Sequence, residues 1–321
     1  MNFIETHETE IKKRTASQII LKFKGYTLLV FLSIIWGLAF VAIREAVLVL
    51  TPINLTLLRW IIASAGFLVI LPFIKAKMKF ERKDIPKLLV MSLTNVAGYN
   101  IALNYAETSI SAGLAALLIS FGPVFITLLS AVTLKERIGM RVGLALLLAI
   151  IGTLFLSFTS IGPGYTGILG PVEVILAAVS YAIFTVVSKP LVHKYGALPV
   201  TIWMALAGTV MIIPLISPSF IYQVEVLPTI GWISVIYLAI LSTVLGYSLF
   251  YVLVGRNLVS KLSVQLYIVP VVSVIGGAIL LKEDVTAFTI LGGAFLLAAV
   301  GLTTMKKKGD SGYSFQIRKN V

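Results

Sequence analysis

The sequence contains one stretch twice, and this duplication restricts the fold more than any other feature. The first copy runs from Pro123 to Glu136 and the second from Pro270 to Glu283, and in both the glutamate follows the proline by 13 residues. A helix rises about 1.5 Å per residue, so proline and glutamate lie about 20 Å apart along a helix. That distance predicts a proline deep in a bilayer and a charged pair near its surface.

Shorter matches extend the duplication over most of the chain. Tyr99 matches Tyr247 at an offset of 148 residues, and Pro52 matches Pro199 at an offset of 147. A period close to half of the 321 residues indicates two copies of one large unit, not an array of short repeats.

The composition identifies this unit as a membrane unit. The chain is 59% hydrophobic and 12% charged, and its mean hydropathy is +1.03. A soluble domain cannot bury so much apolar surface, so we expect a polytopic membrane protein. The absence of cysteine excludes disulfides, thiol catalysis and cysteine-ligated metal. Residues 1–24 are polar and basic, which predicts a tail and not a cleaved signal peptide.

The hydropathy pattern predicts an all-α integral membrane protein with ten transmembrane helices. Each predicted span approaches the ~20 apolar residues that cross a bilayer core. The predicted spans are residues 25–43, 53–74, 88–106, 111–133, 142–158, 168–188, 197–216, 228–252, 262–281 and 286–305.

The duplication and the spans together predict the domain organisation. We expect a cytoplasmic N-terminal tail over 1–24, a first five-helix repeat over 25–158, a second over 168–305, and a cytoplasmic C-terminal tail over 306–321. Five is an odd number, so the second repeat enters the membrane from the opposite side. Such inverted repeats allow two nearly equivalent packings, one open to each side, which is the basis of alternating access.

The positive charges predict the orientation. With both termini in the cytoplasm, 23 of the 26 lysines and arginines fall in inner segments, and only Arg44, Arg59 and Lys282 do not. This bias is typical of insertion into the cytoplasmic membrane. The net charge of +13 is therefore a topology signal with some attraction to anionic lipid, and it does not indicate nucleic-acid binding.

Several of these features together resemble the drug/metabolite transporter superfamily, in its ten-helix EamA-type branch. The resemblance covers residues 26–305. The residues that carry it are Trp36-Gly37 in the first span, Pro52 and Arg59 in the second, and the pairs Pro123/Glu136 and Pro270/Glu283. The resemblance implies a central cavity lined by spans 1, 3, 4, 6, 8 and 9, with spans 5 and 10 peripheral. It also implies export or exchange of small metabolites and leaves the substrate open.

Polar residues deep in the spans are the candidate substrate-binding residues. Span 3 holds Asn95, Tyr99 and Asn100 near its midpoint, and Asn95 and Tyr99 share a face of a regular helix. Tyr247 is the repeat partner of Tyr99 in span 8. Such side chains either line a wet cavity or make hydrogen bonds between helices.

Further candidates lie in the other central spans. Trp36 and Tyr181 are mid-span aromatics, and Gln265 and Tyr267 precede Pro270 in span 9; packing is the alternative role for the aromatics. The two prolines of the duplicated stretch, Pro123 and Pro270, are candidate hinges because proline kinks a helix.

The charged residues are mostly assigned structural roles. The pairs that end in Glu136 and Glu283 mark span boundaries or pair within loops. Glu173 complements the dipole of a helix start, with coupling or gating as the alternative. Arg59 is expected to snorkel or to pair with Glu45 or Glu107, with anion binding as the alternative.

Small residues in spans 5 and 10, such as Gly152 and Gly292, predict close helix packing, either within the chain or in a homodimer.

No catalytic motif is present. The sequence has no P-loop, GxSxG or HExxH motif, and its two histidines are His7 in the tail and His193 in an inner loop. We therefore expect no enzyme, no cofactor and no metal site. The predicted function is a secondary transporter that moves a small metabolite across the cytoplasmic membrane by alternating access. A membrane scaffold or receptor and an uncoupled channel are the alternatives.

The middle of the spans also predicts the substrate class. Every acidic residue lies in a tail, a loop or a terminal turn, whereas the middle holds amide, hydroxyl and aromatic groups. A buried organic cation needs a nearby carboxylate. We therefore expect amino-acid-like or neutral metabolites as substrates and little binding of lipophilic quaternary cations.

Overall fold

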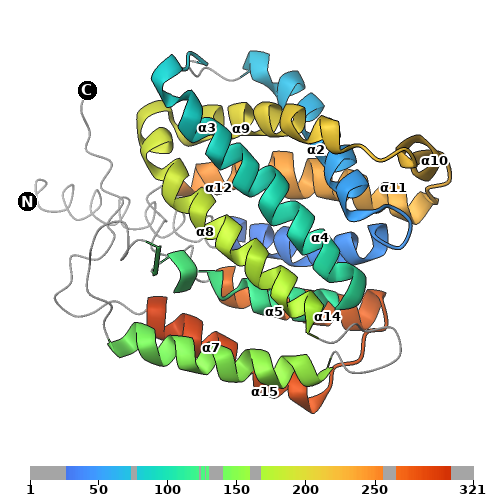
Figure 1. Ribbon diagram of the computed structural model, residues 1–321, viewed down its shortest axis with the longest axis vertical. Coiled ribbons are helices and arrows are strands. Elements are labelled where there is room, and N and C mark those ends of the chain that lie inside the picture. Colours follow the sequence, from blue (N-terminus) through green and yellow to red (C-terminus); the bar gives the residue numbers. More distant parts are fainter. Residues whose placement is uncertain are drawn as a thin grey trace, which may run out of the picture.

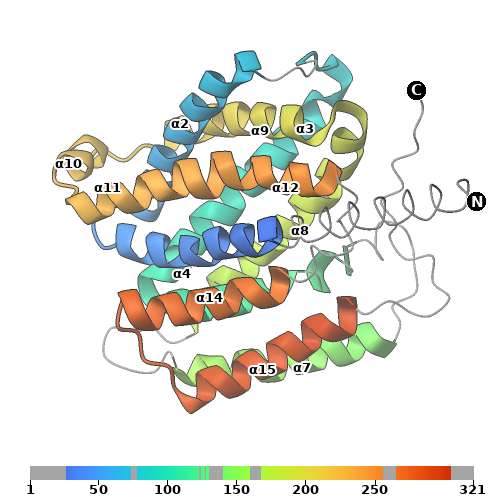
Figure 2. The same ribbon diagram turned by 180° about the vertical axis from the view of Figure 1, so that it is seen from behind.

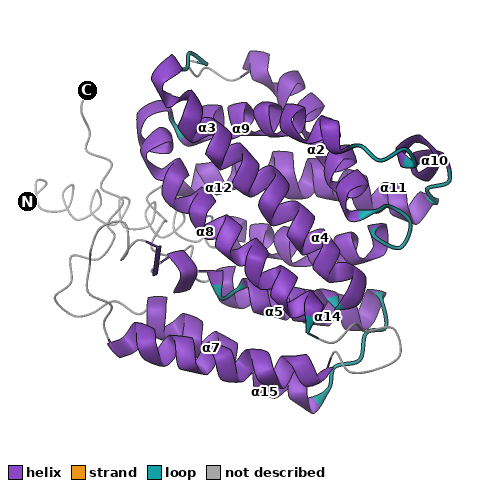
Figure 3. Ribbon diagram, in the orientation of Figure 1, coloured by secondary structure: helices purple, strands orange, loops and turns teal. Residues whose placement is uncertain are grey.

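All of the regular secondary structure is helical in the part of the chain that the computed structural model describes, with loops between the helices (Figure 3). The described residues are 27–73, 78–122, 124–126, 128–129, 140–159, 168–255 and 265–304. The predicted hinge residue Pro123 and the charged pair that ends in Glu136 lie outside them.

Among the described residues, five helical runs are long and apolar enough to cross a membrane, and shorter apolar stretches accompany them. The long runs are Thr27–Ala46, Pro52–Phe73, Leu169–Tyr195, Ala197–Leu215 and Thr229–Phe250. They contain the first helix (Thr27–Ala46), α2 (Pro52–Ile70), α8 (Leu169–Tyr195), α9 (Ala197–Ile212), α11 (Thr229–Ile236) and the start of α12 (Gly246–Gly255). The shorter apolar stretches lie in α5 (Ala112–Ile119), α7 (Met140–Thr159), α14 (Gln265–Leu280) and α15 (Ala287–Thr304).

One helical run is more polar than the others. α3 (Ile85–Ser92), a π-helical segment (Leu93–Tyr99) and α4 (Asn100–Ser109) follow one another without a break. The short helix α10 (Phe220–Glu225) lies in the loop between α9 and α11.

The helices lie in two layers (Figures 1 and 2). The run from α3 to α4 packs along α8 on one face, and the first helix, α11–α12 and α14 lie side by side on the other. The first helix begins and α15 ends on the same side of the molecule, at the left of Figure 1. α7 and α15 pair along one edge, which agrees with the peripheral place that the resemblance implies for spans 5 and 10.

The pairing of α7 with α15 brings two backbones into contact. A Cβ atom added at Gly152 would lie 2.9 Å from the carbonyl oxygen of Gly292, and one at Gly292 would lie 2.8 Å from that of Gly152. Small residues allow such an approach between helices in a membrane. These two glycines therefore serve packing within the chain.

Two π-helical segments occupy corresponding places in the two halves. One ends at Tyr99, and the other spans Tyr237–Leu245 between α11 and α12. A side chain in or directly after each segment donates to the carbonyl five residues earlier. Asn100, the first residue of α4, donates from Nδ2 to Asn95 at 2.8 Å, and Thr243 donates from Oγ1 to Leu238 at 2.8 Å. Such segments are rare and frequently lie at functional sites.

The structure corrects the predicted end of the sixth span. α8 continues to Tyr195, so His193 lies in the last turn of a helix and not in a loop. Hydropathy locates the end of an apolar run, whereas the helix ends where the backbone turns. The turn occurs at Gly196, whose φ of 83° suits glycine, and basic residues in the last turn complement the helix dipole.

Candidate functional site

Arg59 connects the two π-helical segments at the centre of the bundle. Its Nη1 donates to Oδ1 of Asn100 at 3.0 Å. Its Nε and Nη2 donate to Oγ1 of Thr243 at 3.2 and 3.1 Å. Arg59 is the eighth residue of α2, about 10 Å from the helix start, and only 8% of it is exposed.

The expected roles of Arg59 were therefore wrong. It is buried and does not snorkel, and within the described residues it forms no ion pair with Glu45 or Glu107. Sequence periodicity could not show this, because the partners of Arg59 lie 41 and 184 residues away.

Aromatic rings surround this centre. The rings of Tyr99 and Tyr181 lie 5.7 Å apart, and those of Trp36 and Tyr247 lie 6.1 Å apart. The ring of Tyr181 also lies 5.8 Å from that of Phe184.

Two predicted site residues have buried amide atoms without a hydrogen-bond partner. Both amide atoms of Asn95 lack a well-formed hydrogen bond, although the side chain lies next to the Tyr247 hydroxyl. Nε2 of Gln265 also lacks one. An unpartnered buried polar group costs about 1–3 kcal/mol, so it indicates a site that a ligand or water can complete.

The indole of Trp36 is held against the second half of the chain. Its Nε1 donates to the carbonyl of Ser242 at 3.1 Å. A Cβ atom added at Gly246 would lie 2.7 Å from Trp36 Nε1, so a glycine is needed at that position. Trp36 therefore lies where the two predicted halves meet.

The structure brings six of the eight predicted substrate-binding residues together around Arg59. The other two have no described contact with this cluster. The six are Trp36, Asn95, Tyr99, Asn100, Tyr181 and Tyr247. Gln265 lies at the start of α14. The hydroxyl of Tyr267 faces α15, since a Cβ atom added at Gly301 would lie 3.4 Å from it.

The predicted gating residue Glu173 and the predicted hinge residue Pro270 make no described hydrogen bond with the central cluster. Glu173 is partly buried in the first turns of α8, and Pro270 is buried inside α14.

Acidic residues gather at the other end of α4, where the sequence suggested a partner for Arg59 in Glu107 and a boundary or loop-pairing role for Glu283. Glu107 is completely buried, and neither carboxylate oxygen has a hydrogen-bond partner. Arg44 donates to the backbone carbonyl of Glu107 and not to its side chain. The carboxylate of Glu283 accepts from the backbone N–H groups of Ala112 at 2.9 Å and Gly113 at 3.5 Å. Glu283 therefore stabilises the start of α5.

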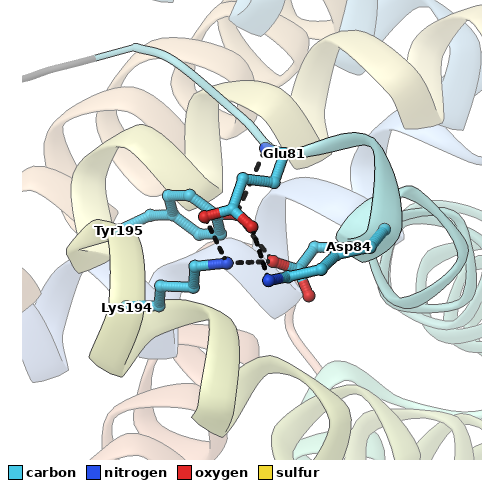
Figure 4. A network of polar contacts seen from close by, with 5 residues as sticks. Glu81, Asp84, Lys194 and Tyr195 are labelled. Carbon is cyan, nitrogen blue, oxygen red and sulfur yellow. Dashed lines mark hydrogen bonds and ion pairs between the residues drawn. The ribbon is translucent and has the colours of Figure 1, made fainter.

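A polar network joins the start of α3 to the end of α8 on the side where the first helix begins (Figure 4). Lys194 Nζ lies 2.7 Å from carboxylate oxygens of both Glu81 and Asp84. The hydroxyl of Tyr195 donates to Asp84 at 2.6 Å. Hydrogen bonds from Lys194 and then Tyr195 lower the pKa of Asp84, and hydrogen bonds from Lys194 and Lys83 lower the pKa of Glu81.

The described residues contain no group of three or more His, Asp or Glu side chains that could hold a metal ion. The polar groups at the centre are amides, hydroxyls and one guanidinium, which bind solutes through hydrogen bonds. Apolar helices that enclose such a cluster are the architecture of a multi-pass membrane transporter of small metabolites.

The comparison with known sequences makes this assignment more specific. The chain belongs to the EamA-like transporter family, whose model matches residues 23–158 and 168–305.

Relatives along almost the whole chain are named as transporters. An "uncharacterized transporter" of Archaeoglobus fulgidus is 34% identical, over 85% of this chain and 95% of the relative. A "probable terminal-alkyne amino-acid exporter" of Streptantibioticus cattleyicolor is 29% identical over 89% and 95%. A "probable amino-acid metabolite efflux pump" of Escherichia coli K12 is 27% identical over 86% and 93%. A solved crystal structure shares the fold, with a TM-score of 0.58 at 17% identity over 87% of this chain and 96% of the other.

Proposed function

We propose that the protein is a secondary transporter that exports or exchanges amino-acid-like or neutral small metabolites across the cytoplasmic membrane by alternating access. The observation that carries this proposal is the buried side chain of Asn95 in a polar cluster, because its two amide atoms make no well-formed hydrogen bond although the Tyr247 hydroxyl lies beside them. A solute with hydrogen-bonding groups would complete these bonds. The names of the amino-acid exporter and efflux pump among the relatives support this substrate class.

The proposed architecture is ten transmembrane helices in two inverted five-helix repeats, with both termini in the cytoplasm. Two matches of one family model and two π-helical segments in corresponding places support the duplication. The first helix starts and α15 ends on the same side of the molecule, which agrees with an even number of membrane crossings. A scaffold or receptor and an uncoupled channel are the competing functions.

The proposed substrate site consists of the central cluster, to which Gln265 and Tyr267 add groups from α14. In this proposal Pro270 acts as a hinge of α14, together with Pro123 in the first half, and Glu173 contributes to coupling or gating. Because the cluster holds no acidic side chain among the described residues, it favours zwitterionic and neutral solutes over lipophilic quaternary cations.

Counterflow in proteoliposomes tests the function. Vesicles loaded with unlabelled phenylalanine should accumulate labelled phenylalanine transiently, because a carrier exchanges bound solute during each cycle. A channel would show only passive flux, and a scaffold would show neither.

Variants of the π-helical segment test the site. Asn95→Leu should reduce exchange at least 10-fold, since buried polar groups of a solute would then lack partners. Thr94→Val is the matched control, because the Thr94 hydroxyl donates to its own helix at Val90. Equal loss of exchange in both variants would point to damage of the helix and would contradict the proposed site.

A further inference from the structure

The guanidinium of Arg59 is a buried charge that forms no ion pair among the described residues. Among the described residues it makes hydrogen bonds only to the neutral side chains of Asn100 and Thr243. Glu107 also acts on it electrostatically, but no ion pair forms. A charge so deep in a membrane protein is costly, and it is normally paired or functional. The guanidinium therefore lies next to the candidate substrate site without a direct ion-pair partner.

The fold itself does not require a cation at this position. Pro52 and Pro199 correspond in the internal duplication, and the same offset of 147 residues relates Arg59 to Leu206. α2 and α9, which carry these two residues, pack against each other. The corresponding helix of the second predicted repeat therefore carries an apolar side chain at the position of Arg59.

The hydrogen bonds of Arg59 leave donors available. An arginine side chain has five N–H donors, and the bonds from Nε, Nη1 and Nη2 engage one donor on each nitrogen. One N–H therefore remains on each of the two terminal nitrogens. A carboxylate accepts two such hydrogen bonds at once, and this pairing is among the strongest in proteins.

The neighbours of Arg59 suit the rest of a carboxylate-bearing solute. The amide of Asn95, which makes no well-formed hydrogen bond, lies next to the Tyr247 hydroxyl. The amide oxygen of Asn95 can accept a hydrogen bond from an ammonium group, and the ring of Tyr181 lies 5.7 Å from that of Tyr99. An amino acid presents a carboxylate, an ammonium group and a side chain in this way.

We propose that Arg59 is the carboxylate-binding residue of the central site, and that the protein selects solutes that carry a carboxylate. This inference rests on the proposed function, because it names the chemical class of the transported solute. Asn100 and Thr243 then act as positioning residues, which hold the guanidinium between the two π-helical segments.

Binding to the purified wild-type protein tests this selectivity directly. The probes are phenylalanine, 3-phenylpropanoate, which lacks the ammonium group, and phenethylamine, which lacks the carboxylate. Calorimetry should show binding of the first two and an affinity for phenethylamine lower by about 10- to 100-fold, the range expected for a charge-assisted pair. Equal affinity for phenethylamine and phenylalanine would overturn the proposal without any variant.

Two substitutions add an independent test. Arg59→Gln should weaken the binding of 3-phenylpropanoate by about 10- to 100-fold and leave the affinity for phenethylamine unchanged. The affinity of Arg59→Lys for 3-phenylpropanoate should lie between those of the wild-type protein and Arg59→Gln. Ser64→Ala is the matched control, because Ser64 lies in the same helix and makes a buried hydrogen bond to Thr209 at 2.9 Å. Unchanged carboxylate binding in a folded Arg59→Gln protein would overturn the proposal, and if this variant does not fold, the wild-type selectivity decides.

The outcomes separate this inference from the carrier function. Counterflow of phenethylamine as fast as that of phenylalanine would overturn the carboxylate site and leave the carrier standing. Carboxylate-dependent binding without counterflow would support the Arg59 site and contradict the carrier.

Discussion

At the scale of single residues, Glu107 is the least satisfied side chain that the structure describes. It is fully buried and both of its carboxylate oxygens lack a partner, whereas Arg44 is engaged with its backbone carbonyl. Natural proteins keep such groups where function requires them, and stability decreases as a result. Glu107 should therefore lower the free energy of unfolding.

Replacing Glu107 by the apolar residue Met should raise the free energy of unfolding by about 1–3 kcal/mol, because the variant no longer buries an unpartnered polar group. Denaturation of the purified protein in detergent measures this change. Glu45→Gln is the control, since Glu45 is only partly buried and a change within about 0.5 kcal/mol is expected there. A less stable Glu107→Met protein would show that the carboxylate has a stabilising partner.

At the scale of helical elements, two contacts of different kinds hold neighbouring helices together. α7 and α15 meet through glycine backbones, and the start of α3 meets the end of α8 through ion pairs. The contact between α7 and α15 depends on side-chain volume, and the contact between α3 and α8 depends on side-chain charge. Substitutions that change only one of these properties distinguish the two.

Gly292→Ala should lower the free energy of unfolding by about 1–3 kcal/mol, since its Cβ atom would overpack a tight contact. The new atom would lie 2.6 Å from Leu156 Cγ and 2.8 Å from the Gly152 carbonyl oxygen. Gly143→Ala in α7 is the matched control, because no atom lies within 4 Å of the added Cβ. That control should be stabilised by about 0.5–1 kcal/mol. Similar effects of both substitutions, measured by thermal unfolding, would contradict the close contact.

Asp84→Asn should lower the melting temperature at neutral pH and leave it unchanged in acid. The pKa of Asp84 is lowered in the folded protein, chiefly by hydrogen bonds from Lys194 and Tyr195. Its contribution is therefore present above the unfolded pKa of about 4 and is lost as the pH falls through the lower folded value. Melting curves of both proteins should converge as the pH drops below about 4. Lys83→Gln is the control, and it should change the melting temperature little because the Lys83 side chain is 74% exposed. A difference in melting temperature between Asp84→Asn and the wild-type protein that does not depend on pH would exclude an ionic role of Asp84.

At the scale of the whole molecule, the distribution of charge and of helix ends predicts one orientation. The first helix begins and α15 ends on the side of the polar network around Lys194, and the sequence places its basic residues on that side. α10 lies at the opposite end of the bundle. We therefore expect α10 outside the cell.

Single-cysteine labelling checks this orientation in a chain without native cysteine. A Tyr222→Cys protein should react with a membrane-impermeant maleimide added to intact cells, since Tyr222 in α10 is 66% exposed. Lys79→Cys, at the exposed start of the network segment, should react only after the membrane is opened. The reverse pattern would invert the topology.

Sequence reasoning located most elements because ~20 apolar residues are needed to cross a bilayer. It also selected Asn95 and Tyr247, since polar side chains in an apolar span need partners. It could not place Arg59 or Glu107, because hydropathy does not report which neighbour a side chain meets. It also assumed a regular helix at Asn95 and Tyr99, whereas the structure has a π-helical segment there, and residue periodicity does not predict such a segment.

The difference between Arg59 and Leu206 has a consequence for how the two halves can be combined. If the halves are inverted copies, a dimer of two first halves would place two guanidinium groups near one centre, and they would repel each other. A dimer of two second halves would place two leucines there and no cation. Only the pairing of one first half with one second half supplies a single positive charge, so neither half can replace the other. Co-expressed separate halves should therefore assemble as one copy of each.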